Sequence, residues 1–112
     1  METIYDVKCT LDYQDGYLCI VNDDAMVDNF FEACDEQLGK GVLVASPKPE
    51  TWGEDFSFYC NEVPGMFAIV CAGYDDGRMN YSNHNSRFDW DEKAMSYGIQ
   101  AELASVMKFF EK

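Results

Sequence analysis

The sequence lacks any apolar run as long as a membrane span, and it opens without the charged segment and apolar core of a secretory leader. It also lacks paired cysteine spacing, since its five cysteines are scattered and form no CxxC pair that would indicate a disulfide framework or a zinc knuckle. Four of the five fall within apolar runs or on an expected apolar helix face, where a thiol behaves as a small hydrophobe. Together these features predict a soluble, cytoplasmic protein in a reducing compartment.

Basic residues are scarce. Lys and Arg number 8 against 21 Asp and Glu, so the formal net charge is −13. A chain this acidic repels phosphate backbones and anionic bilayers, so we expect neither nucleic acid nor membrane partners. Hydrophobic residues make up 47% of the chain, which excludes a disordered class, and 112 residues allow one domain at most.

Complete catalytic motifs are absent as well. There is no Gly-rich phosphate loop, no GxSxG elbow and no cysteine with a histidine close in sequence. His84 is the only histidine, so the chain offers no second imidazole to a metal ion that needs three or four protein ligands. The residues therefore carry part of a site and not a whole one.

Four segments have the patterns of strands. Residues 5–13 alternate between apolar and polar side chains, which predicts a half-buried strand. Residues 17–21 follow an Asp-Gly turn and are either a second strand that pairs back or an extended connection. The short apolar run at residues 41–45 predicts another strand, and residues 66–72, apolar on both faces, predict a central one.

Helical patterns alternate with these strands. The first helix should begin at the capping residues 22–24 and end at Gly39, and the second should begin at Glu54 and Asp55. The last helix is expected to have Asp89 as its cap, in a capping box with Glu92. Its apolar stripe consists of Met95, Ile99, Leu103, Val106 and Phe110. The alternation predicts an α/β fold with layered α/β/α packing, a mixed sheet, flanking helices and a long C-terminal helix.

A polar loop at residues 74–88 lies between the most apolar run and the last helix, and it carries His84. A lone histidine is more often an ordinary side chain, but open α/β sheets place their sites beyond the carboxyl ends of strands, so this position modestly strengthens the case for a metal ligand or an acid–base group. An ordinary exposed or hydrogen-bonded histidine is the alternative.

Two acidic pairs are weaker candidates. Glu54 and Asp55 are a catalytic pair or ligands, or they only serve the dipole of the helix they precede. Asp75 and Asp76 stand beside glycine and arginine, a composition typical of a solvent-exposed turn. For both pairs the structural role is favoured.

Several short motifs recur in a specific order. They are Gly53-Glu54-Asp55-Phe56-Ser57, Val63-Pro64-Gly65, Gly73, His84, Phe88-Asp89 and Asp91-Glu92. In this order and spacing they resemble the C-terminal portion of the dinuclear-metal amidohydrolases, the aminoacylase and carboxypeptidase class that includes hippurate hydrolase and the N-acyl amino acid amidohydrolases. Near the start, three motifs resemble the last strand of that family's inserted lid domain and its return to the catalytic domain: Leu11-Asp12-Tyr13, Gly16-Tyr17 and Val21-Asn22-Asp23.

The resemblance implies a hydrolase that cleaves the amide of N-acyl amino acids or small peptide-like substrates. It implies two divalent metal ions, zinc or manganese, and a glutamate general base that directs their shared water at the amide carbon. It places the last metal ligand on His84 and assigns no catalytic residue to this chain. It also places Gly53, Glu54 and Asp55 near the substrate pocket.

Length is the main departure from the family, whose members are several times longer. Asn85 and Ser86 also replace the histidine or small residue and the proline that are usual there. The resemblance assigns residues 1–21 to the end of a lid-domain strand and its return arm, and residues 22–112 to the C-terminal segment of a metallopeptidase-like catalytic domain. With one imidazole, the chain alone is expected to be inactive and to bind no metal tightly.

Two other interpretations stay open. The chain is a non-catalytic module derived from such a hydrolase, which binds a partner or forms a homo-oligomer through surface that the rest of the domain would cover. Alternatively, it is a plain acidic α/β domain whose histidine has no function.

Overall fold

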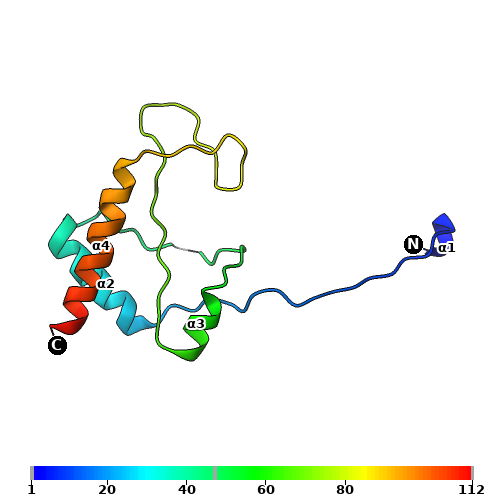
Figure 1. Ribbon diagram of the computed structural model, residues 1–112, viewed down its shortest axis with the longest axis horizontal. Coiled ribbons are helices and arrows are strands. Elements are labelled where there is room, and N and C mark those ends of the chain that lie inside the picture. The colour runs from blue at the N-terminus through cyan, green and yellow to red at the C-terminus, as the bar shows by residue number, and fades with distance from the viewer. Residues whose placement is uncertain (1, 47, 112) are drawn as a thin grey trace.

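The computed structural model describes residues 2–46 and 48–111, and their regular structure is helical. The helices are α1 (Glu2–Tyr5), α2 (Asp24–Leu38), α3 (Ser57–Glu62) and α4 (Lys93–Phe110). Long irregular segments connect them, and residues 6–16 run away from the remainder as an extended arm that ends at α1 (Figure 1). The Cα radius of gyration is 19.5 Å, against about 13 Å for a compact domain of 100 residues.

The predicted α/β fold class is wrong, because the described residues contain no β-strand and no sheet. The apolar run at residues 66–72 follows a nearly straight path from α3 to the polar loop (Figure 1), without a neighbouring strand. Hydrogen bonds hold it near its two ends: Asp23 N donates to Gly65 O at 2.9 Å, and Asp91 N donates to Ala72 O at 2.8 Å. Apolarity therefore identified an extended segment, but a strand also requires a backbone ladder.

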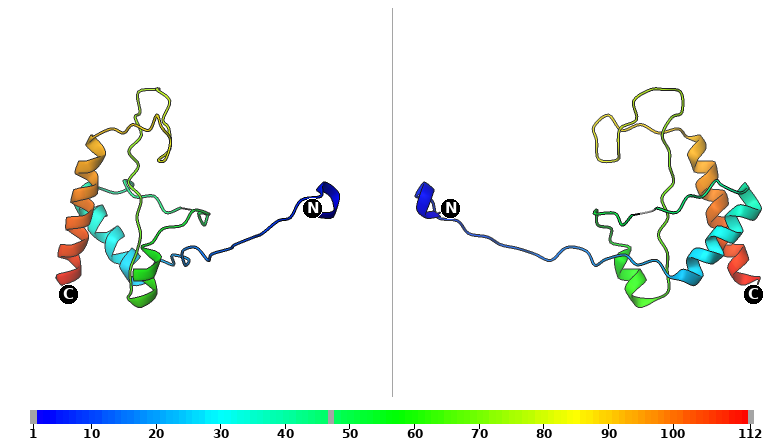
Figure 2. Two further views of the ribbon diagram at one scale, coloured as in Figure 1. Left: turned by 45° about the vertical axis from the view of Figure 1, so that its right-hand side comes forward. Right: turned by 180° about the vertical axis from the view of Figure 1, so that it is seen from behind.

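The other expected strands are also absent from the described residues. Residues 6–13 and 41–45 are irregular in the structure, and residues 2–5, which overlap the first expected strand, are helical. For residues 17–21, the alternative of an extended connection agrees with the structure. Figure 2 shows from two further sides that no segment lies beside residues 6–13, whereas the Tyr17 ring contacts the Phe58 ring of α3, with centroids 6.2 Å apart. A period of two predicts which face of a strand would be buried, but it does not provide the partner strand.

The prediction of the first helix is confirmed. Asp23 is the N-cap of α2, and its side chain accepts a hydrogen bond from Met26 N at 3.1 Å. Gly39 ends the helix at a φ of 97°, a conformation that favours glycine. The second helix, α3, is also present but starts later than expected, so that Glu54 and Asp55 precede its first turn.

The prediction of a capping box at the start of the last helix is wrong. The N-cap position of α4 is Glu92, which makes no side-chain capping bond. Asp91 Oδ1 instead accepts a hydrogen bond from Lys93 N at 3.0 Å, and Asp89 is used elsewhere, as described below. Two aspartates close to a helix start are both plausible caps in sequence, and the backbone path decides between them.

The core lies between α2 and α4, which pack against each other (Figure 1). The buried apolar side chains of these two helices are all small: Ala33, Cys34, Ala94 and Ala101. Buried Asn29 donates from Nδ2 to Ser105 O at 3.0 Å and to Ser105 Oγ at 3.2 Å. At the rim, Lys108 Nζ lies 2.6 Å from Glu36 Oε1, and this hydrogen bond raises the pKa of Lys108.

The expected apolar stripe of α4 is not its buried face. Met95, Ile99 and Leu103 are 46%, 57% and 59% exposed, and Val106 and Phe110 are exposed as well. The buried positions are the small residues Ala94 and Ala101, and Ala101 lies one turn before Ser105, which is bonded to Asn29 of α2. Periodicity located an amphipathic helix correctly, but close packing of small residues determined which side is covered.

The cysteines are less buried than expected. No disulfide joins them within the described residues, yet only Cys34 is buried, Cys60 is partly buried, and Cys9, Cys19 and Cys71 are exposed. Burial raises the pKa of the Cys34 thiol, and neighbouring Asp35 adds to the effect. None of the helices in the described ranges combines the length and apolarity needed to span a bilayer.

Candidate functional site

The polar loop at residues 74–88 leaves the extended segment and returns to the start of α4 (Figure 1). Its two arms meet at the base, where Asp91 N donates to Ala72 O at 2.8 Å. The loop therefore emerges from a closed neck, although it contains no helix or strand of its own.

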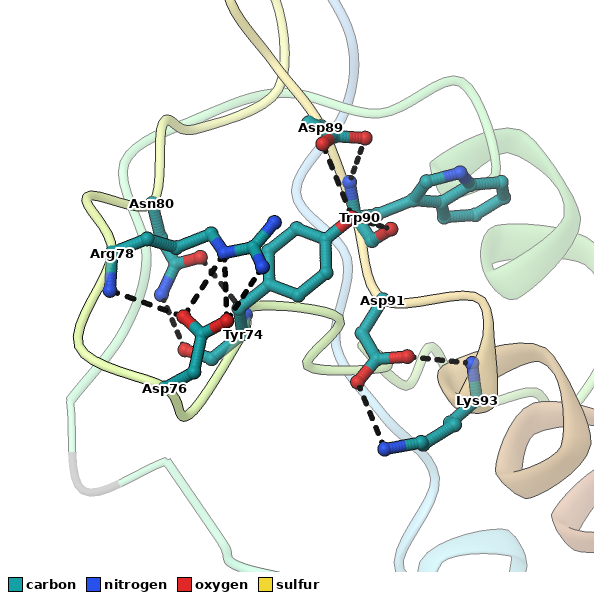
Figure 3. A network of polar contacts seen from close by, with 8 residues as sticks. All are labelled: Tyr74, Asp76, Arg78, Asn80, Asp89, Trp90, Asp91 and Lys93. Atoms are coloured by element: carbon teal, nitrogen blue, oxygen red, sulfur yellow. Dashed lines mark hydrogen bonds and ion pairs between the residues drawn. The ribbon is translucent and has the colours of Figure 1, made fainter.

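Tyr74 organises the base of this loop. Its hydroxyl lies 2.7 Å from Trp90 O and 3.1 Å from Asp89 Oδ2, so it donates to acceptors on the returning arm (Figure 3). Burial raises the pKa of Tyr74, and the hydrogen bond to the Asp89 carboxylate raises it further. Arg78 stacks over the tyrosine ring, with its guanidinium carbon 3.9 Å from the ring centroid.

The pair Asp75 and Asp76 forms part of a turn, in agreement with its structural interpretation. Asp76 accepts hydrogen bonds from Arg78 Nε at 2.9 Å, and these bonds hold the pKa of the Asp76 carboxyl below its usual range. Both partners are about half exposed, so the pair orders the turn locally and contributes little to stability.

His84 lies near the tip of the loop, in a turn closed by a hydrogen bond from Asn85 N to Ser82 O at 3.2 Å. Its φ is +67°, a left-handed conformation that histidine adopts more readily than bulky or β-branched residues do. The side chain is exposed and makes no hydrogen bond to the described part of the chain. Both ring nitrogens are therefore accessible to a ligand.

An open groove of about 740 Å³ lies beside this loop. Volumes of this order are usual for small-molecule sites. Its polar lining comes from Glu54, Asn80, Asn83, His84 and Asp89, and its aromatic lining from Trp52, Phe67, Tyr81, Phe88 and Trp90. Trp52 and Phe67 are in contact, with ring centroids 5.9 Å apart.

The groove brings together residues predicted to belong to one site. Gly53 and Glu54 line it from the segment before α3, and His84 lines it from the polar loop. Asp55 does not line it, and its backbone N–H donates a hydrogen bond to Glu54 Oε1 at 3.1 Å. Gly53 has a packing role too, since a Cβ at this position would lie 3.0 Å from the Tyr17 ring.

Sequence reasoning missed Tyr74, Asn80 and Trp90 as residues of this site. Asn80 forms a two-way pair with the backbone of Tyr74: its Nδ2 donates to Tyr74 O at 2.8 Å, and its Oδ1 accepts from Tyr74 N at 2.9 Å. Asp89 was predicted, but as a helix cap. No local sequence pattern marks contacts between the two arms of an irregular loop.

A metal ion is not held by the described residues alone. Within residues 2–46 and 48–111, no three His, Cys, Asp or Glu side chains are close enough to form a metal site. His84 could supply one nitrogen, but a structural or catalytic metal requires three or four protein ligands. The described chain therefore provides one donor toward such a centre.

Comparison with known proteins places the chain in a family. Residues 3–108 match the peptidase family M20/M25/M40. The chain is 30% identical over 85% of its length to the probable hydrolase sll0100 of Synechocystis sp., and 31% identical over 74% to the putative amidohydrolase YhaA of Bacillus subtilis. It is 34% identical over 79% of its length to the N-acetyldiaminopimelate deacetylase of Enterococcus faecalis.

These matches cover 24%, 21% and 21% of the three relatives, so the chain spans about a quarter of the length of the curated relatives it matches. No solved structure matches the chain significantly. The family match covers nearly all of its residues and includes both the Gly53-Glu54 segment and the His84 loop. The chain therefore belongs to the peptidase family M20/M25/M40 of hydrolases.

Proposed function

We propose that the chain forms the C-terminal segment of a metal-dependent amidohydrolase that cleaves the amide of N-acyl amino acids or small peptide-like substrates. The observation that carries this proposal is the exposed imidazole of His84 on the groove that Glu54 also lines. The names of two relatives, a putative amidohydrolase and a deacetylase, agree with hydrolysis of an amide.

In this proposal His84 supplies one ligand to a pair of divalent ions, zinc or manganese. Such ions, when bound, activate water for attack on an amide carbon. We assign no catalytic step to the described residues, because no three of their potential ligands converge. Gly53 and Glu54 contribute to the substrate side of the groove. The scattered cysteine spacing, with no CxxC pair, supports a cytoplasmic location.

The groove lining also bears on the substrate. Trp52, Phe67 and Trp90 offer apolar surface, and Asn80 and Asn83 offer amide groups that can donate and accept hydrogen bonds. An N-acyl amino acid combines an apolar portion with an amide and a carboxylate. Its apolar portion can contact the aromatic side chains of the groove, and its polar groups can form hydrogen bonds with the two asparagines. The strongly acidic chain, with a net charge of −13, argues against anionic polymers as substrates.

The isolated chain and a chimera test this function together. The chimera replaces the matching segment of the Enterococcus faecalis deacetylase with this chain. With manganese, cobalt or zinc present, we expect the isolated chain to hydrolyse N-acyl amino acids no faster than the metal alone, and the chimera to hydrolyse them measurably. Turnover by the isolated chain would refute its inactivity, and a folded but inactive chimera would count against the proposed function.

A second candidate function is a partner-binding or self-associating module, favoured by the exposed apolar stripe of α4. Leu103 and Phe110 are 59% and 78% exposed there. If association is the function, light scattering should give a stable dimer or larger species at micromolar concentration, and Leu103→Glu should convert it to a monomer. A monomeric wild-type chain would exclude the self-associating form of this candidate.

A further inference from the structure

The His84 loop needs a device that fixes its position, because residues 74–88 contain neither helix nor strand. A long irregular loop loses considerable conformational entropy when its tip is held in one place. Tyr74 stands at the base of the loop, and its side chain is bonded to the returning arm (Figure 3).

Three kinds of contact meet at Tyr74. Its hydroxyl reaches Asp89 Oδ2 and Trp90 O on the returning arm, at 3.1 and 2.7 Å. Its backbone N–H and C=O are both bonded to the Asn80 side chain on the outgoing arm, at 2.9 and 2.8 Å. Its ring supports the Arg78 guanidinium at 3.9 Å.

The pairing with Asn80 depends on Gly73. A Cβ at position 73 would lie 3.0 Å from Asn80 Nδ2 and 3.1 Å from Asn80 Cγ, so a larger residue would displace the amide. The base of the loop is thus built for this set of contacts. Nearer the tip, the Arg87 guanidinium lies 4.3 Å from the centroid of the Tyr81 ring and joins the two arms again on either side of His84.

We propose that Tyr74 is a positioning residue, whose hydroxyl ties the returning arm to the outgoing arm and so holds His84 at the groove. The inference rests on the proposed function in giving His84 a role, while the tie itself is defined by contacts within this chain. Asp89 contributes to the same tie, because its Oδ2 accepts a hydrogen bond from the Tyr74 hydroxyl at 3.1 Å and its Oδ1 accepts one from Trp90 N at 2.9 Å. Asp89 lines the groove together with His84.

The test compares Tyr74→Phe, Tyr74→Ala and the control Tyr97→Phe in the isolated chain, without metal or substrate. Tyr74→Phe removes only the hydroxyl and retains the ring under Arg78. Tyr97 is 52% exposed on α4, and its hydroxyl has no bond to the described residues, so the control makes the same chemical change outside the network. Amide exchange of the bonded N–H groups of Asn85 and Phe88 reports loop opening.

We expect Tyr74→Phe to accelerate exchange at Asn85 and Phe88 about fivefold to tenfold. This is the effect of losing one hydrogen bond whose donor, the Tyr74 hydroxyl, is shared between the Trp90 carbonyl and the Asp89 carboxylate. Tyr74→Ala should accelerate it further, and Tyr97→Phe should leave it unchanged. Exchange in α2 and α4 should stay constant in all three variants, which separates loop release from general unfolding. Equal loop exchange in wild type, Tyr74→Phe and Tyr97→Phe would overturn the inference.

The single histidine gives a second readout, since its imidazole produces one set of NMR signals. The groups facing the Tyr74 hydroxyl are the Asp89 and Asp91 carboxylates, which raise its pKa, and Arg78, which opposes them. The tie is present below the ordinary tyrosine pKa and is lost as the pH rises through the raised value. The His84 signals should therefore shift in that alkaline range in wild type and in Tyr97→Phe, but not in Tyr74→Phe.

Failure of this inference and failure of the proposed function are distinguishable. If the His84 signals follow the same alkaline course with and without the Tyr74 hydroxyl, Tyr74 does not position the histidine, whatever His84 does. If the tie is verified but the chimera remains active after His84 is replaced, the metal-ligand role fails while the loop device stands.

Discussion

Replacing His84 with asparagine in the chimera is expected to lower the hydrolysis of N-acyl amino acids at least about 100-fold. Loss even of outer-shell partners of metal ligands costs roughly 10- to 100-fold, so loss of a ligand should cost more. Asparagine suits the backbone φ of +67° at this position, so the substitution removes the imidazole without adding strain. The measurement is kcat/KM with saturating metal.

Ser86→Ala is the matched control for that experiment. Ser86 lies in the same loop, is exposed, and its side chain makes no hydrogen bond to the described residues. It should retain the activity of the unmodified chimera. If His84→Asn and Ser86→Ala have equal rates, His84 has no role in the reaction and the plain-histidine interpretation is correct.

Replacing Ala101 with leucine is expected to lower the free energy of unfolding by about 1–3 kcal/mol, the usual effect of overpacking a core. Ala101 is 8% exposed and faces α2, where Ala33 is 3% exposed and Cys34 fully buried. The larger side chain would push the two helices apart and strain the bonds from Asn29 to Ser105. Urea unfolding followed by helix circular dichroism measures the change.

Ala25→Leu provides the control for this substitution. Ala25 lies in the first turn of α2 and is exposed, so the same added volume has room in solvent. Its effect on unfolding should be within about 0.5 kcal/mol, as for other surface substitutions. If Ala101→Leu unfolds at the same urea concentration as Ala25→Leu, the core does not lie between α2 and α4 as described.

The helix bounds could be predicted where residues close in sequence determine them. Asp23 caps α2 and Gly39 ends it, because an oxygen acceptor and a residue tolerant of positive φ act within a few positions in sequence. The prediction of strands was wrong because a strand depends on residues distant in sequence. Residues 66–72 have the apolarity of a central strand, but a strand is defined by hydrogen bonds to a neighbour, and sequence pattern alone cannot supply one.

The face of α4 shows a second limit of prediction. Its large apolar residues, such as Ile99 and Leu103, have the stronger hydrophobic signal, yet the buried residues of α4 are Ala94 and Ala101. Small residues contribute little to a hydrophobic pattern but permit close helix contact. The side of α4 that is buried therefore depends on where the rest of the chain packs against it, and the periodicity within α4 cannot reveal this.

The site was predictable in part. His84 was expected on an exposed loop, and the structure places it, with Glu54 and Gly53, on one groove. Asp55, which the resemblance also places near the substrate pocket, does not line this groove. The Tyr74 contacts could not be anticipated, since they join the outgoing arm to the returning arm and depend on the path of the loop.

The metal content of the chimera provides the most direct test that His84 completes a metal centre. It is measured by plasma emission spectrometry after unbound metal has been removed, in the unmodified chimera and in its His84→Asn variant. We predict a full metal pair in the first and a clear deficit in the second, with both proteins folded. Equal metal content in the two would contradict His84 as a metal ligand.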